Sequence, residues 1–393
     1  MIMDLKEEAR GHLQQKLIPF WEGLADERFG GYCGYVGFDL RPDVSAPKGC
    51  ILNSRILWFF SRAAQTLKEE RLLAYARRAY DFFPHFVDGD NGGLFWSVTY
   101  DGQPLDTMKH TYVHAFAIYG LVAYAEASGD REALERAMAL YTLIETRMRD
   151  GHGYLEAFSR EFEPLENAKL SDNPKLLARG VIARRTMNTI LHLVEAYTQL
   201  YRVGRDDRVR NSLQNLLWVV ENRVYNRERN RLEVFFDDDL NSIFDMQSYG
   251  HDIEASWLID LAAQTALSPE DCARVRGWTT ELACGVIDRA FQGGRLLNEN
   301  TEGENDPTCI WWVQAETMVG LANLWQKTGD LRWKMDMEEA WRFITTRLVD
   351  PREGSEWFWS LAGDGTVCEK PIVEPWKCPY HNGRMCMELM ARL

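Results

Sequence analysis

The most regular feature of this chain is an alternation between two kinds of helical pattern. Several segments carry apolar residues at three-to-four spacing, and most of them end near a glycine. Each is followed by a more charged amphipathic segment, such as 71–86 or 131–148. The alternation predicts pairs of helices, one apolar and one amphipathic. The apolar members are the segments 51–67, 110–130, 186–204, 252–267 and 311–330.

Similar polar turns separate these helical pairs. Each turn is Gly-rich or polar and precedes a short aromatic or branched run, which is typical of a small β-hairpin. Successive turns lie about 60 residues apart, with one longer gap before the fourth, and such a period indicates a repeated supersecondary unit. Only the fourth turn lacks glycine. The turns are the segments 26–35, 88–97, 149–158, 226–236, 291–299 and 352–360.

These patterns predict an all-α fold, an (α/α)6 barrel that spans residues 1–393 as a single catalytic domain. Apolar helices form the inner ring of this toroid, charged helices form the outer ring, and short β-hairpins lie at one mouth. An open helical solenoid is the competing architecture, but it needs polar capping repeats that the sequence does not show. The first turns of the inner helices converge on one mouth, and we expect the chemistry there.

Charge and composition exclude several classes of partner. A net charge of −14 disfavours nucleic acid and anionic membrane surfaces, because both are bound through clustered Lys and Arg. The N-terminus lacks the basic start and apolar run of a signal peptide, and no stretch reaches the roughly 18 to 20 apolar residues of a membrane span. The eight cysteines include no C-x-x-C pair, which favours reduced thiols. We therefore expect a cytoplasmic protein.

Aromatic content is the first unusual property of the composition. Aromatic residues make up 12% of the chain, and 14 of them are tryptophans. Flat rings suit a sugar site, where the apolar faces of sugars stack on aromatic side chains. A tryptophan-rich helical core explains the same figures and is favoured on composition alone.

The segment "YGHDIEASW" contains the most suggestive pair of titratable residues. His251 and Glu254 are three apart, so on a helix they share a face and can form a hydrogen bond, and Trp257 continues that face. A carboxylate beside an imidazole fixes its tautomer and raises its basicity. An acid that merely caps a helix start is the alternative interpretation.

A polar stripe formed by Asn188, His192 and Glu195 crosses an otherwise apolar helix. Such a stripe is either solvated or lines a pocket, and the inner position of this helix favours a pocket. His110 and His114 have the spacing of metal ligands, but no third ligand lies nearby in the sequence, which disfavours a metal site.

Two further candidates lie at the starts of predicted inner helices. Arg55 is a cation among apolar neighbours, which suits either recognition of substrate oxygens or a buried pair with an acid. His381 lies in a Pro/Gly-bounded turn that leads into the last helix. Closure of the ring places it at the mouth, opposite His251, although a histidine that only pins the chain end is the simpler alternative.

At these residues the chain resembles the N-acylglucosamine 2-epimerase superfamily, over nearly its whole length. The sequences "YGHDIE" and "PYHNGR" are more similar to those of the disaccharide epimerases of this superfamily than to those of the enzymes acting on N-acylhexosamines. The six motifs that carry the resemblance are "ILNSRILWFFS", "DTMKHTYVHAFAIYGL", "MNTILHLVEAYTQLY", "SYGHDIEASWL", "WWVQAETMVG" and "PWKCPYHNGRMCMEL".

The resemblance implies a barrel enzyme without nucleotide or metal cofactor that inverts C2 of the reducing-end glucose in β-1,4-linked disaccharides. The expected partner is thus a disaccharide or monosaccharide substrate, and the expected state is a monomer or weak homodimer. Asn53 is a departure, because some members have histidine there. The functional positions implied are His251, His381, His192 and Glu254 as catalytic residues, with Arg55, Tyr112, Asn188, Trp257, Trp312, Glu316 and Trp376 binding the substrate.

The required chemistry fits these residue types. A C2 proton becomes acidic only beside a carbonyl, so the sugar ring must open before a side-chain base can act. Arg55, with Asn188 or Tyr112, can stabilise the resulting cis-enediolate. His251 and His381 can exchange base and acid roles on opposite faces of C2, so we expect them on opposite sides of that carbon, with Glu254 hydrogen-bonded to His251.

Three alternatives remain open at this stage. An inverting glycoside hydrolase could use Glu254 and Glu316, provided that the carboxyl groups lie roughly 6.5 to 9.5 Å apart. A non-catalytic sugar-binding protein needs only the aromatic pocket. Within the superfamily, a mannose 2-epimerase or mannose/fructose isomerase is the first alternative, and an N-acylglucosamine 2-epimerase is less favoured.

Overall fold

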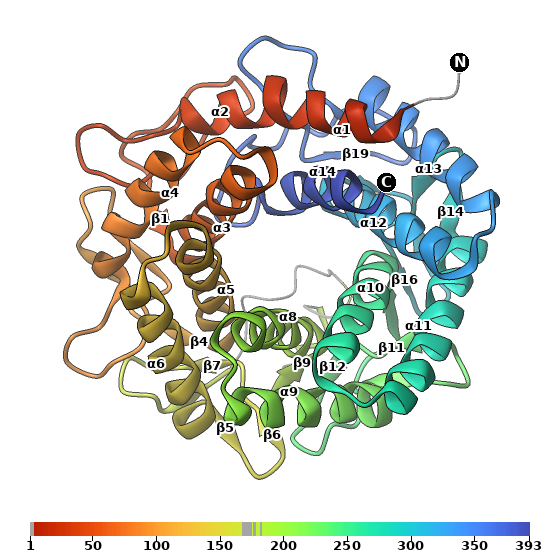
Figure 1. Cartoon of the computed structure of the whole chain (residues 1–393), viewed down its shortest axis with the longest axis horizontal. Helices are drawn as coiled ribbons and strands as arrows, with labels where there is room; N and C mark the ends of the chain where they lie inside the picture. The colour runs from red at the N-terminus through yellow and green to blue at the C-terminus, as the bar shows by residue number, and fades with distance from the viewer. Residues whose placement is uncertain (1–3, 167–174, 176–177, 181–182) are drawn as a thin grey trace.

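Two concentric rings of helices make up the computed structural model, which describes residues 4–166, 175, 178–180 and 183–393 (Figure 1). Each inner helix packs against the next along the chain, and the last packs against the first, so the inner ring is closed. The described inner helices are α3 (Cys50–Leu67), α5 (Thr111–Ser128), α8 (Met187–Gly204), α10 (Tyr249–Ala266), α12 (Trp311–Thr328) and α14 (Tyr380–Arg392).

The outer ring consists of more charged helices, each packed on an inner partner. The N-terminal segment pairs with α14, so the first and last helices of the chain complete the ring together. The all-α barrel expected from the sequence is confirmed. The outer elements are α1 (Leu5–His12), η1 (Leu13–Leu17), α2 (Ile18–Glu22), α4 (Arg71–Phe82), η2 (Phe83–Phe86), α6 (Arg131–Arg147), α9 (Asp207–Val219), η3 (Val220–Val224), α11 (Pro269–Ala290), α13 (Arg332–Phe343) and η4 (Ile344–Leu348).

The links between inner and outer helices follow the expected chemistry. Gly129 and Gly329 end α5 and α12 in the left-handed conformation, with φ of 77° and 70°. Asp130 then caps α6 by accepting hydrogen bonds from the backbone N–H groups of Glu132 and Ala133. In each Gly-Asp dipeptide of this kind, the glycine ends one helix and the aspartate accepts a hydrogen bond from a backbone N–H at the start of the next.

Short antiparallel strands gather at the mouth where the inner helices begin (Figure 1). A strand runs directly into α3, α5, α8, α10 and α12, so the first turns of these helices share one end of the barrel. The three-stranded sheets are β1–β2–β3 (Lys48–Gly49, Ser97–Val98, Pro104–Asp106), β4–β7–β8 (Lys109–His110, Ala157–Phe158, Pro164–Leu165) and β13–β16–β17 (Met246–Ser248, Glu299–Thr301, Glu304–Asp306).

Two-stranded pairs complete the β-structure of the described residues, and the predicted turns coincide with antiparallel pairing. In the turn without glycine, Asn230 adopts the positive φ of 46°. The pairs are β5–β6 (Arg149–Asp150, Gly153–Tyr154), β9–β12 (Arg185–Thr186, Phe235–Phe236), β10–β11 (Tyr225–Asn226, Arg231–Leu232), β14–β15 (Phe291–Gln292, Arg295–Leu296) and β18–β19 (Cys309–Ile310, Ser360–Leu361).

A repeated buried ion pair fixes two of these turns to the following inner helix. Lys48 Nζ lies 2.7 Å from Asp26 Oδ2, and Lys109 Nζ lies 2.8 Å from Asp88 Oδ2. Each ammonium also donates to a carbonyl oxygen of the same turn. Because the lysines immediately precede α3 and α5, the ion pairs hold the hairpins over the helix starts.

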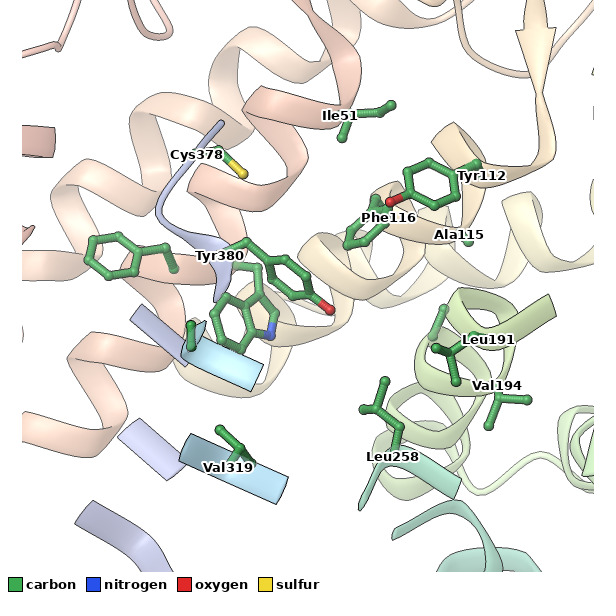
Figure 2. Packing of buried hydrophobic residues seen from close by; sticks show 14 of the residues in the cluster. Ile51, Tyr112, Ala115, Phe116, Leu191, Val194, Leu258, Val319, Cys378 and Tyr380 are labelled. Atoms are coloured by element: carbon green, nitrogen blue, oxygen red, sulfur yellow. The ribbon is translucent and has the colours of Figure 1, made fainter. Parts of the chain in front are cut away.

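The buried hydrophobic side chains of the described residues form one cluster within and between the two rings. Figure 2 shows part of it, with Tyr112 and Phe116 from α5 near Tyr380 at the start of α14. The ring centroids of Phe116 and Tyr380 lie 5.1 Å apart. Among the helices described, none is both long and apolar enough to cross a membrane.

Candidate active site

A cavity of about 420 Å³ opens at the mouth where the inner helices begin. This volume lies within the range usual for small-molecule sites. Its wall combines aromatic rings with titratable groups drawn from all the inner helices or the segments just before them. Of the residues predicted from the sequence, those that line the cavity are Arg55, Tyr112, Asn188, His192, His251, Glu254, Trp312, Trp376 and His381.

Two predicted substrate-binding residues, Trp257 and Glu316, do not line this cavity. Both side chains are buried, and Trp257 donates from Nε1 to Glu316 Oε2 at 3.1 Å. Trp257 lies about one turn after Glu254 on α10, and Glu316 lies about one turn after Trp312 on α12, so both side chains are behind the wall of the cavity. The structure therefore gives them contact with residues that line the cavity rather than with the cavity itself.

Arg55 is a buried cation on the cavity wall. Its Nη2 donates to the hydroxyl of Tyr112 at 2.8 Å, and its Nη1 donates to the carbonyl of Trp376 at 3.3 Å. Its guanidinium carbon also lies 4.0 Å from the ring centroid of Phe116. No carboxylate of the described residues lies within ion-pair distance of Arg55. Of the two interpretations of Arg55 from the sequence, recognition of substrate oxygens and a buried pair with an acid, the second is therefore excluded for the described part of the chain.

His251 has a serine as its hydrogen-bond partner, contrary to the prediction. Its Nδ1 lies 2.7 Å from Ser248 Oγ, whereas Glu254 is held by the guanidinium of Arg384. The expected hydrogen bond between Glu254 and His251 is therefore wrong in this structure, because a stronger cationic partner takes the carboxylate. Burial, with the charge of His192 adding to it, lowers the pKa of His251 to about 3.

The predicted pairing of histidine and glutamate occurs instead on α8. His192 Nδ1 lies 2.9 Å from Glu195 Oε2, at the same i, i+3 spacing. Burial opposes ionisation of Glu195, but the charges of Arg384 and His192 outweigh it and lower the pKa of Glu195 to about 2. Burial lowers the pKa of His192, and the carboxylate only partly offsets that effect.

His381 has a carboxylate partner from another helix. Its Nδ1 lies 2.8 Å from Glu316 Oε1 and 3.9 Å from Glu254 Oε1. Burial, followed by the charge of Arg384, holds the pKa of His381 well below its ordinary value. The imidazole is thus neutral at pH 7, with Nδ1 engaged behind the wall and Nε2 left for the cavity.

The ring of Trp312 contacts both predicted acid–base histidines. The ring centroid of Trp312 lies 4.7 Å from that of His251 and 5.3 Å from that of His381. Trp376 lies on another part of the wall, 5.8 Å from the ring of Tyr112. The cavity therefore offers separate aromatic planes on which sugar rings can stack.

Sequence reasoning missed the residues that hold these histidines in place. Arg384 is completely buried and donates to three carboxylates, those of Glu195, Glu254 and Glu316. Tyr380 donates to Glu195 at 2.6 Å. The sequence does contain one signal for Arg384. It lies three residues after His381, the same spacing as Glu195 after His192, which places both residues of each pair on one helix face.

One group of side chains in the described residues has the composition of a metal site. Glu254, Glu316 and His381 each offer a ligand atom, and these atoms lie within 4.8 Å of one another. Local spacing does not predict this cluster, because its members are far apart along the chain. Arg384 Nη2 donates to both carboxylates, so a guanidinium already takes the oxygens that would bind a metal ion, and this donor set does not fit one.

The histidines with metal-like spacing on α5 have structural roles. His114 accepts from the backbone N–H of Leu94 at 3.0 Å, and its Nδ1 lies 2.8 Å from the carbonyl of His110. His110 caps α5 by accepting from the N–H of Tyr112 at 3.2 Å. Neither histidine lines the cavity.

Comparison with known proteins gives concordant results. A sequence profile of the family described as N-acylglucosamine 2-epimerase (GlcNAc 2-epimerase) matches residues 31–383. The chain is 45% identical to a cellobiose 2-epimerase of Eubacterium cellulosolvens, with 96% of each chain covered. The structure of cellobiose 2-epimerase from Bacillus thermoamylovorans B4167 matches with a TM-score of 0.94 at 40% identity, covering 99% of each chain. A D-mannose isomerase structure shares the fold, with a TM-score of 0.83 at 18% identity over 99% of this chain and 98% of that one.

Proposed function

Because the chain belongs to the N-acylglucosamine 2-epimerase family, we propose that it epimerises C2 of the reducing-end glucose in β-1,4-linked disaccharides. Cellobiose is the substrate that its relatives' names indicate, and 4-O-β-glucosyl-mannose is the product. The 393 residues act as a single catalytic domain, which the single hydrophobic cluster supports. The observation that carries the proposal is a buried cation without a carboxylate partner among the described residues, in one cavity with three neutral histidines.

The reaction begins by opening the pyranose ring. The O1 hydroxyl loses its proton, O5 gains one and the C1–O5 bond breaks, which gives an aldehyde at C1. His192 lines the cavity beside the proposed C2 bases and is available for this proton transfer. Its Nδ1 contact with Glu195 favours the tautomer whose Nε2 accepts a proton.

Proton exchange at C2 follows on the open-chain sugar. One of His251 and His381 removes the C2 proton in its neutral form and becomes an imidazolium. The other enters the step as an imidazolium, having taken a proton from solvent, and returns that proton to the opposite face, so that the two histidines exchange protonation states. Burial lowers the pKa of each imidazole, so the neutral form predominates at pH 7 and either histidine can act as the base. Trp312 contacts both rings, and both histidines line the same cavity, which supports a substrate within reach of two bases.

The cis-enediolate formed between these steps carries negative charge on O1 and O2. Arg55 provides the opposite charge, and Tyr112 donates a hydrogen bond from a hydroxyl that Arg55 already orients. Burial raises the pKa of Tyr112 to about 12, so this phenol stays a donor across the working pH range. Asn188 adds a neutral amide donor at the cavity wall. Preorganised donors of this kind stabilise developing charge most effectively.

The proposed enzyme needs neither nucleotide nor metal. In the one metal-like cluster of the described residues, the guanidinium of Arg384 already contacts both carboxylates. Acidity at C2 comes from the aldehyde, and stabilisation of the enediolate comes from Arg55. No step of this sequence requires a Lewis acid.

The carboxylate geometry disfavours the hydrolase alternative. An inverting hydrolase holds its carboxyl groups about 6.5 to 9.5 Å apart on either side of the bond that it cleaves. Glu254 and Glu316 have oxygens within 4.8 Å of each other, both bound to one guanidinium, and Glu316 lies behind the cavity wall. These carboxylates therefore cannot flank a glycosidic bond with a water molecule between them.

One experiment separates the remaining candidates. The chain is incubated with cellobiose in D2O, and the products are examined by NMR. Deuterium at C2 together with glucosyl-mannose supports the epimerase, whereas free glucose indicates a hydrolase and unchanged cellobiose indicates a binder. Incubation with mannose tests the monosaccharide alternatives, because an isomerase yields fructose and a mannose 2-epimerase yields glucose.

A further inference from the structure

Arg384 occupies the centre of a buried charge cluster beneath the cavity. It lies on α14, three residues after His381, and its side chain is 1% exposed. Its Nη1 donates to Glu195 and its Nη2 to Glu254 and Glu316, at 2.7 Å for Glu316. These carboxylates come from α8, α10 and α12, so one guanidinium joins four inner helices.

The carboxylates outnumber the guanidinium, which disfavours ionisation of all three at once. Glu316 accepts from Arg384, from Trp257 at 3.1 Å and from His381 at 2.8 Å. Burial raises the pKa of Glu316, and the charge of Arg384 and the hydrogen bonds that it accepts oppose that effect. Glu254 accepts from Arg384 alone among the described residues, and its Oε2 has no partner there. Burial, followed by the charge of Glu316, raises the pKa of Glu254 to about 8.

Two of the three carboxylates, those of Glu195 and Glu316, are also the partners of two cavity histidines. Glu195 contacts His192 Nδ1 at 2.9 Å, and Glu316 contacts His381 Nδ1 at 2.8 Å. A carboxylate at Nδ1 holds the proton there and leaves the Nε2 lone pair free to act as a base. Arg384 has no hydrogen bond to either histidine side chain among the described residues. It instead holds Glu195 and Glu316, the carboxylates that contact His192 and His381.

We propose that Arg384 is a positioning residue for the epimerisation, acting through Glu195 and Glu316 to set the orientation and tautomer of His192 and His381. The proposal rests on the proposed function for the reaction concerned. Isolated carboxylates in this buried place would take up protons or turn away, because a charge left without its partner is costly. Each histidine would then lose the acceptor that holds its Nδ1 proton.

The test compares Arg384→Met and Arg384→Lys with Arg392→Met as a matched control. Arg392 lies on the same helix and also faces the ring of Trp257, at 5.6 Å, but pairs with Glu388 outside the cavity. We expect kcat on cellobiose to fall about 10- to 100-fold in both Arg384 variants with little change in KM. The control is expected to retain the wild-type kcat.

The pH profile distinguishes positioning from a merely structural role. The charge of Arg384 contributes to the lowered pKa of His381, so its removal raises that pKa. The acid limb of kcat/KM is therefore expected to move to higher pH in Arg384→Met and to stay in place in Arg384→Lys, which keeps the charge. A loss of thermal stability with an unmoved acid limb and an unchanged kcat overturns the proposal.

Histidine NMR gives a readout that does not depend on activity. With 15N-labelled histidine, His192 and His381 are expected to show the Nδ1–H tautomer in the wild type. In Arg384→Lys we expect a mixture of the Nδ1–H and Nε2–H tautomers. This variant allows the measurement even if Arg384→Met does not fold. Wild-type tautomers that persist in Arg384→Lys refute the positioning role. A wild-type chain that leaves cellobiose unchanged refutes the proposed function instead.

Discussion

Replacement of Arg55 by methionine is expected to change activity and stability in different ways. Arg55 is the buried cation that faces the proposed enediolate, and it also orients the hydroxyl of Tyr112. Loss of one preorganised donor costs about 10²- to 10³-fold in kcat in comparable sites. Because this substitution removes both a charge and the orientation of a second donor, we expect a loss at the upper end, about 10³-fold.

The effect on stability follows from the contacts of the same side chain. Methionine loses hydrogen bonds to Tyr112 and Trp376, each contributing about 1 kcal/mol, and a cation–π contact with Phe116 of about 0.5 to 2 kcal/mol. It also removes the desolvation penalty of a buried cation that lacks an ion-pair partner among the described residues, which amounts to several kcal/mol. We therefore expect the free energy of unfolding to change by no more than about 1 to 2 kcal/mol.

The assay follows glucosyl-mannose formation from cellobiose, and urea denaturation measures stability. Cellobiitol cannot form an enediolate, so its binding by calorimetry reports ground-state affinity and is expected to change little. Arg62→Met is the matched control, since Arg62 lies on the same helix and pairs with Glu126 near the surface. Near-normal turnover of Arg55→Met, or a loss of kcat no larger than that of the control, would refute the assigned role.

Four further outcomes are expected. His251→Asn and His381→Asn should keep the fold and cellobiitol binding yet lower kcat by about 10²- to 10⁴-fold, and near-normal epimerisation by His381→Asn would contradict the two-base mechanism. The acid limb of kcat/KM should lie below pH 6.5, because burial lowers the pKa of both histidines and they protonate only at lower pH; a limb above 6.5 would count against these bases. Treatment with a chelator should leave kcat unchanged, and loss restored by an added metal would overturn that expectation. Lys109→Met should lower the free energy of unfolding by about 1.5 to 3 kcal/mol in urea titration, since it removes one charge-assisted hydrogen bond to Asp88 while Arg160 keeps two, and a change below about 0.5 kcal/mol would contradict it.

The helical pattern was predictable because burial acts on it directly. The inner helices are almost fully buried, so their sequences are mostly apolar, and glycine or polar turns mark where most of them end. The ion pairs between Lys48 and Asp26 and between Lys109 and Asp88 were not predictable. Their members are separated by a whole hairpin, and nothing in local periodicity indicates that they meet.

The same limit applies to the site. Residues in the first turns of inner helices were identified correctly as neighbours of one cavity, because the closed ring brings those turns together. Their pairing was not. His192 and Glu195 form the i, i+3 contact expected for His251 and Glu254, although the spacing is identical. The difference arises from Arg384, whose guanidinium takes Glu254, and no single-helix pattern contains that information.

The arrangement of charges around the cavity suits a reaction that separates charge. Arg55 and Arg384 contact the ring of Tyr380 at 4.8 and 4.2 Å, so the same aromatic side chain borders both guanidinium groups. Arg55 has no carboxylate partner among the described residues, whereas Arg384 is surrounded by an excess of carboxylates. Removal of the C2 proton makes an enediolate and an imidazolium at once. Arg55 stabilises the enediolate, and the carboxylate of Glu316 stabilises the imidazolium when His381 is the base, so neither group must reorganise as the charges form.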